Sequence, residues 1–91
     1  MEETQAGEWT GFTFPVKDED LEVFEKVTSQ LIGVRYTPFA VASQLVSGKN
    51  YCFIAGGEAV MPVAPQSVAQ IYVYLPLKGD PHITEIKRLN P

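Results

Sequence analysis

The chain has 91 residues, the length of a single domain, and 45% of them are hydrophobic, which excludes a wholly disordered chain. Eleven acidic residues against seven basic ones give a net charge of −4, and the chain contains no basic run. Nucleic-acid binding, which needs clustered cations, is therefore excluded as a leading function. No apolar stretch approaches membrane-spanning length, so we expect no membrane association.

The N-terminal residues 1–10 are predicted to form a flexible arm on one domain that spans residues 1–91. Met1 to Ala6 is polar and acidic, unlike a signal peptide. The expected location is therefore cytoplasmic if the chain is complete, and secreted or periplasmic if a signal peptide has been removed. Phe12 and Phe14 then recur with period two, which indicates a short extended segment on a sheet.

A helix of about 13 residues is predicted from Asp18, the expected N-cap, to the stop at Gly33. Acidic residues in its first turn suit the positive end of the helix dipole. Apolar residues recur at steps of three and four: Leu21, Val23, Phe24, Val27 or Thr28, and Leu31. A helix this short needs a sheet to pack against.

Four strands are predicted to follow. The first runs from Val34 to Val46 with Pro38 at a bend or an edge, and the second runs from Asn50 to about Val60. The doublet Gly56-Gly57 indicates a bulge or a sharp curl in the second strand. A loop with Pro62, Pro65 and Gln66 comes next.

The third strand, Val68 to Leu75, alternates apolar and polar residues most cleanly. A turn from Pro76 to Pro81 leads to a last strand, Ile83 to Leu89, in which Ile83 and Ile86 fall out of phase. One helix followed by consecutive antiparallel strands predicts an α+β fold with the helix packed on one face of a sheet of four to five strands.

The stretch from Gln44 to Tyr51 is predicted to be the hairpin between the first two strands, with its tip at Ser47 to Asn50. Leu45 and Val46 stand directly beside that tip. They could point into the core of an ordinary tight turn, or protrude and enter the cleft of a partner. The pattern alone favours neither reading.

This stretch also carries a family resemblance. Gln44-Leu45-Val46-Ser47-Gly48 resembles the Gln-x-Val-x-Gly signature of the cystatins, reversible inhibitors of papain-like cysteine proteases, and Asn50-Tyr51 extends the match. The similarity runs from about Gly7 to Leu89 and is closest to the single-domain stefin type. It implies a curled sheet wrapped round one helix, no cofactor, and a protease as the partner.

The resemblance implies three binding segments at one end of the molecule: the arm near a glycine, the first hairpin and the second hairpin. The residues that it assigns to the protease-binding surface are Gly7, Gln44, Leu45, Val46, Ser47, Gly48, Leu77, Lys78, Gly79, Asp80, Pro81 and His82. Gly11 is the rival of Gly7 as the glycine of the arm. The second hairpin lacks the Pro-Trp pair of secreted cystatins, but Leu75-Pro76-Leu77-Lys78-Gly79 is similar to the Leu-Pro-Gly sequence of stefins.

The mechanism implied is a wedge that fills a protease cleft by apolar burial and forms no covalent bond. The alternative is a non-inhibitory protein–protein interaction module on the same scaffold. The protein is expected to be a monomer, with a domain-swapped dimer as a minor or heat-induced form, since strained hinge loops can open and exchange strands.

Catalysis is the weakest interpretation. His82 is the only histidine and Cys52 the only cysteine, so neither a metal site nor a Cys-His couple has enough parts. Cys52 lies in an apolar strand and is expected to be a buried core residue. Glu19, Asp20, Glu22 and Glu25 fit the solvated face of the helix better than an acid–base pair, and we expect no enzyme activity and no metal.

Overall fold

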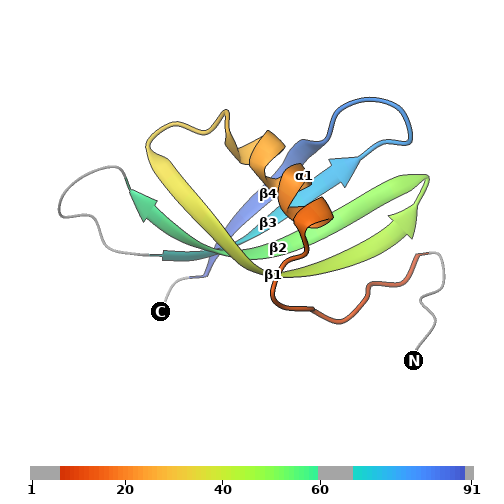
Figure 1. Cartoon of the computed structure of the whole chain (residues 1–91), viewed down its shortest axis with the longest axis horizontal. Coiled ribbons are helices and arrows are strands. Elements are labelled where there is room, and N and C mark those ends of the chain that lie inside the picture. Colours follow the sequence, from red (N-terminus) through yellow and green to blue (C-terminus); the bar gives the residue numbers. More distant parts are fainter. Residues whose placement is uncertain (1–6, 60–66, 90–91) are drawn as a thin grey trace.

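A computed structural model describes residues 7–59 and 67–89. The predictions for residues 1–6, and for the loop with Pro62, Pro65 and Gln66, lie outside the described residues. Within them, one helix crosses one face of a four-stranded antiparallel sheet with strand order β1-β2-β3-β4 (Figure 1). The elements are α1 (Asp18–Thr28), β1 (Val34–Val46), β2 (Gly48–Ala59), β3 (Ser67–Leu75) and β4 (His82–Leu89). The predicted α+β class is confirmed, in an arrangement consistent with a cystatin-like fold.

Helix α1 differs from its prediction at both ends. Lys17, in extended backbone, is the N-cap and makes no side-chain capping bond, so the prediction of Asp18 was wrong by one residue. The helix ends at Thr28. The Ser29 hydroxyl then donates a hydrogen bond of 3.0 Å to the Lys26 carbonyl, one of the carbonyl groups that have no partner within the last turn of a helix. Gly33, with φ of +89°, therefore belongs to the connection between α1 and β1. No helix among the described residues is long and apolar enough to cross a membrane.

The core lies between α1 and the central strands. Phe24 of α1 and Phe53 of β2 are both fully buried, and their rings meet with centroids 4.9 Å apart at 66°. The alternation predicted for β3 is confirmed, because Ala69, Ile71 and Val73 are buried on this side of the sheet. The ring pair and the apolar stripe of β3 hold the helix on the sheet.

Of the two alternatives predicted for Gly56-Gly57, a bulge or a sharp curl, the bulge was wrong, because β1 and β2 stay in register there. The register shift lies instead in β1, between Pro38 and Ala40, and leaves Phe39 without a partner in β2. Gly57 serves packing: a Cβ atom on it would lie 2.8 Å from the ring of Tyr36. The glycine makes room for an aromatic ring on the neighbouring strand.

A second bulge explains the phase break in the last strand. Ile83 pairs with Val73 and Glu85 pairs with Tyr72, so Thr84 is the extra residue. Because of this insertion, Ile83 and Ile86 reach the same face of β4 although an odd number of steps separates them.

The segment before α1 lies along the free edge of β1. Trp9 forms an isolated antiparallel β-bridge with Gln44. Thr13 exchanges two backbone hydrogen bonds with Val41, of 2.9 and 3.0 Å. The expected extended segment on the sheet is confirmed, although Phe14 is 77% exposed and adds little to the core. Residues 7–10 are thus hydrogen-bonded to β1, whereas the sequence assigned them to a flexible arm.

Candidate functional site

The hairpin between β1 and β2 is tighter than predicted. The strands pair as far as Val46 opposite Gly48, so Ser47 alone forms the tip, and Asn50 lies within β2 opposite Gln44. Leu45 is 49% exposed and Val46 is 42% exposed. Two apolar side chains therefore stand at the end of the molecule, half in solvent.

Gly48 holds this tip against the neighbouring hairpin. It has φ of +102° and is buried, and a Cβ atom on it would lie 2.5 Å from the carbonyl oxygen of Leu75. The Tyr74 hydroxyl also donates a hydrogen bond to the carbonyl of Ser47. The glycine allows close approach of the chain to itself, and the β3–β4 hairpin supports the β1–β2 tip.

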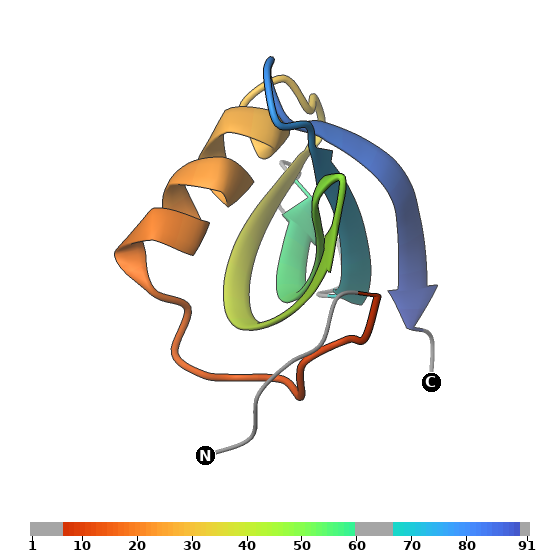
Figure 2. The same ribbon diagram turned by 90° about the vertical axis from the view of Figure 1, so that its right-hand side faces the viewer.

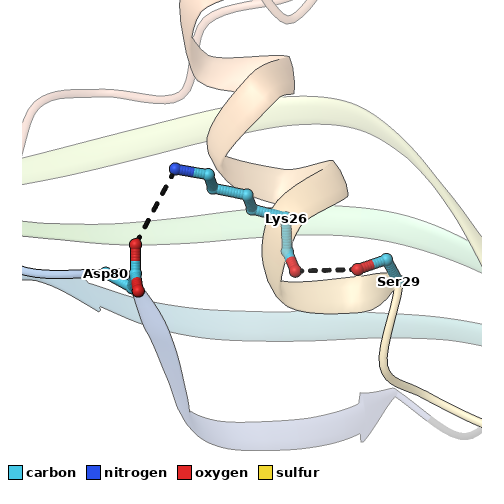
Figure 3. Close-up of polar contacts among 3 residues, drawn as sticks. All are labelled: Lys26, Ser29 and Asp80. Carbon is cyan, nitrogen blue, oxygen red and sulfur yellow. Dashed lines mark hydrogen bonds and ion pairs between the residues drawn. The ribbon is translucent and has the colours of Figure 1, made fainter.

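The connection between β3 and β4 forms the second exposed turn. Leu77 is 79% exposed, and Gly79 turns the chain with φ of +120°. Asp80 lies 3.9 Å from the ammonium nitrogen of Lys26 on α1, as Figure 3 shows. Both side chains are largely in solvent, so this ion pair contributes little free energy, but it links the turn to the helix.

The remaining predicted residues of this turn differ in their surroundings. Lys78 is exposed and Pro81 is half-buried. His82 belongs to β4 and not to the turn, and its ring meets that of Tyr74 at 5.7 Å and 74°. Leu77 is therefore the exposed apolar side chain that this turn adds to Leu45 and Val46 of the first hairpin.

The arm reaches the same end through Gly7. The Gly7 amide donates to the carbonyl of Leu45 over 2.8 Å, and the side-chain amide of Gln44 donates to the carbonyl of Gly7 over 2.9 Å. Asn50 in turn donates to the side-chain oxygen of Gln44, also over 2.9 Å. Gln44 thus ties the arm to both strands of the hairpin. Gly11 lies farther along β1, so Gly7 is the glycine beside the tip.

Figure 1 shows the arm, the β1–β2 tip and the β3–β4 turn at one end of the molecule, and Figure 2 looks onto that end. The pairing of Lys49 with Leu75 places the two hairpins side by side, and the bond from Gly7 to Leu45 places the arm next to them. The three segments that the resemblance implied at one end of the molecule therefore lie together in the structure.

Sequence reasoning missed Tyr74 and Trp9. Tyr74 braces the tip, and Trp9 meets the ring of Tyr72 on the face of the sheet opposite α1. The alternation of β3 placed Tyr72 and Tyr74 on the more polar face, but their partners depend on the register between strands and could not be found from one strand alone.

The described residues contain no group of three or more acidic, histidine or cysteine side chains that could hold a metal ion. Cys52 is buried, and burial raises the pKa of its thiol, opposed by a hydrogen bond with Tyr72. Its neutral form is therefore favoured, which makes it a poor nucleophile.

A scan against protein-family models found no matching family, and searches of curated proteins and of solved structures likewise found no match.

Proposed function

We propose that this protein is a reversible, competitive inhibitor of papain-like cysteine proteases. The observation that carries the proposal is the position of three apolar side chains at one end of the molecule. Leu45 and Val46 at the first hairpin and Leu77 at the second are 49%, 42% and 79% exposed, on backbones already held in place. A surface of this shape suits a narrow cleft, because apolar area is buried with little further ordering of the chain.

The cystatin-like motif divides into two kinds of residue under this proposal. Gln44, Gly48 and Asn50 are engaged within the chain, in hydrogen bonds or in close backbone packing. Leu45 and Val46 remain available to a partner. Complete burial of such a side chain contributes about 1.5 to 3 kcal/mol, so the three side chains would supply part of the binding free energy. The rest would come from other contacts of the same end of the molecule, whose held backbone lowers the entropic cost of binding.

Inhibition without cleavage also has a physical basis. The peptide bonds on either side of Ser47 close a paired hairpin, since Val46 lies opposite Gly48. They cannot lie extended across a protease as a substrate would. No bond to the protease thiol is needed, and a chain with a single cysteine has no internal disulfide to lose, so the inhibitor would work under reducing conditions.

The test is a titration of papain against a fluorogenic substrate, with the substrate concentration varied to identify competition. Val46→Asp and Leu77→Asp should each raise the inhibition constant by about 10- to 100-fold, because a carboxylate would be buried in an apolar contact. Ile32→Asp is the matched control: Ile32 is 97% exposed and precedes the start of β1, at the opposite end of that strand. It should inhibit as the unmodified protein does.

No inhibition at micromolar protein would overturn the proposal, and so would inhibition that Val46→Asp and Leu77→Asp leave unchanged. Gly48→Trp is not a suitable variant. A side chain at that position would collide with Leu75 of the same chain and damage the hairpin itself.

A second candidate function is a non-inhibitory interaction module on the same scaffold. The observation in its favour is that contacts within the chain fully account for the conformation of Gly48, so that residue needs no protease to explain it. This candidate predicts binding to a partner that does not change in Val46→Asp.

A further inference from the structure

The face of the sheet opposite α1 carries an aromatic corner that the proposed inhibitory surface does not use. Trp9 of the arm and Tyr72 of β3 meet there at 84°, with ring centroids 6.2 Å apart. Trp9, the only tryptophan in the chain, has 42% of its surface exposed to solvent. Tryptophan and tyrosine combine an apolar ring with a polar N–H or O–H group, and both are enriched at binding interfaces.

The corner opens into a hollow of about 230 Å³ that is also lined by Asn50, Thr84 and Glu85. The bulge at Thr84 puts Glu85 directly opposite Tyr72. Glu85 is the only lining residue with a charge, and among the described residues it forms no ion pair. Two aromatic rings and a carboxylate without an ion pair among the described residues therefore line one small open volume.

We propose that this hollow binds a cation of the alkylammonium or guanidinium class, as carried by a lysine or arginine side chain of a partner. Such a cation is attracted to the face of an aromatic ring within about 6 Å and to a carboxylate at the same time. A purely apolar guest would bury Glu85 without a counter-charge, which costs free energy. The combination of aromatic rings with a carboxylate therefore favours a positively charged ligand over one that is only hydrophobic.

Two neighbouring groups, Tyr72 and Lys87, affect the binding of a cation in the hollow. The pKa of Tyr72 is raised, first by its interaction with Cys52 and also by the charge of Glu85, so the phenol stays neutral near pH 7. Lys87 lies two residues beyond Glu85 on the same face of β4, opposite Gln70, and does not line the hollow. The positive charge of Lys87 should repel the cation in the hollow and so weaken its binding.

The experiment uses Trp9 as the reporter. The whole protein is titrated with choline, and separately with 3,3-dimethylbutan-1-ol, which replaces the quaternary nitrogen by carbon, while tryptophan fluorescence is recorded at constant ionic strength. N-acetyltryptophanamide corrects for quenching by collision. Choline should bind with a millimolar dissociation constant, and the neutral analogue should bind about tenfold more weakly.

Variants locate the site. Glu85→Gln should weaken choline binding by about fivefold or more, Tyr72→Leu should abolish it, and Lys87→Met should strengthen it. Glu85 and Lys87 are exposed, so their variants should fold normally, as circular dichroism would verify. Equal affinity for the neutral analogue, unchanged binding in Glu85→Gln, or no response to choline at about 100 mM would each overturn the inference. None of these outcomes depends on protease inhibition.

Discussion

Gly48 illustrates at the residue scale how one position can carry a motif and a turn together. Its φ of +102° belongs to the left-handed region, and its missing side chain leaves space for the backbone of Leu75 and Pro76. Any L-residue would meet both the strained backbone and the collision.

Gly48→Ala should therefore lower the free energy of unfolding by about 2 to 5 kcal/mol, the sum of backbone strain and overpacking. Urea denaturation measures this. Gly56→Ala is the matched control on the same strand, because a Cβ atom there has no heavy atom within 4 Å and its φ is not positive. A Gly48→Ala protein as stable as the Gly56→Ala protein would contradict the close packing of the two hairpins.

Cys52 leads to a prediction about pH. Burial raises the pKa of its thiol above the ordinary value of 9.0, and burial together with the charges of Asp20 and Glu19 raises the pKa of Tyr51 above 10.0. A raised pKa in the folded state contributes stability that is fully present below the ordinary value and is lost as the pH rises above it.

The free energy of unfolding should therefore decrease from about pH 9 upward. In Cys52→Ala the free energy of unfolding should decrease less steeply in the first part of that range, because the thiol is absent. Urea denaturation at a series of pH values, with a reducing agent present, measures both slopes. A stability that stays constant between about pH 8 and pH 10 would refute the prediction.

At the scale of elements, the arm and the two hairpins form one hydrogen-bonded unit. Gln44 accepts from Asn50 and donates to Gly7, and the amide of Gly7 donates to Leu45. The arm is attached at this point by few bonds, so each should matter for its order.

Gln44→Met, which keeps the length of the side chain but removes its donor and acceptor, should speed exchange of the Gly7 amide hydrogen about fivefold, the effect of losing about 1 kcal/mol. Hydrogen exchange followed by nuclear magnetic resonance measures it. The amide of Thr13, bonded to Val41 farther along β1, is the internal control and should not change. Equal exchange at Gly7 in both proteins would mean that Gln44 does not hold the arm.

At the scale of the whole molecule, β1 and β2 form one long ladder that is interrupted by the bulge at Phe39 and turns at a single residue, Ser47. Pairing extends from Val34 opposite Ala59 to Val46 opposite Gly48. If the chain straightened at Ser47, two copies could form the same pairs with each other, and only the hinge would differ.

We therefore expect a strand-exchanged dimer as a minor form that increases after heating and cooling at high protein concentration. Straightening would also release Gly48 from its left-handed conformation. Size-exclusion chromatography before and after heating measures the fraction of dimer. A monomer alone after this treatment would contradict the prediction.

Local patterns in the sequence determined the helix, the limits of β1, the two-sided character of β3 and the existence of both turns. Helix and strand periodicities depend on neighbouring residues, so they can be read along the chain. The bulges at Phe39 and Thr84 were not predicted, nor was the packing of Gly57 under Tyr36, because each depends on which residues of another strand lie opposite. The same holds for the meeting of Gly7 with Leu45, of Gly48 with Leu75 and of Trp9 with Tyr72. Only the tertiary structure decides such contacts, since register and chain closure are properties of the assembled sheet.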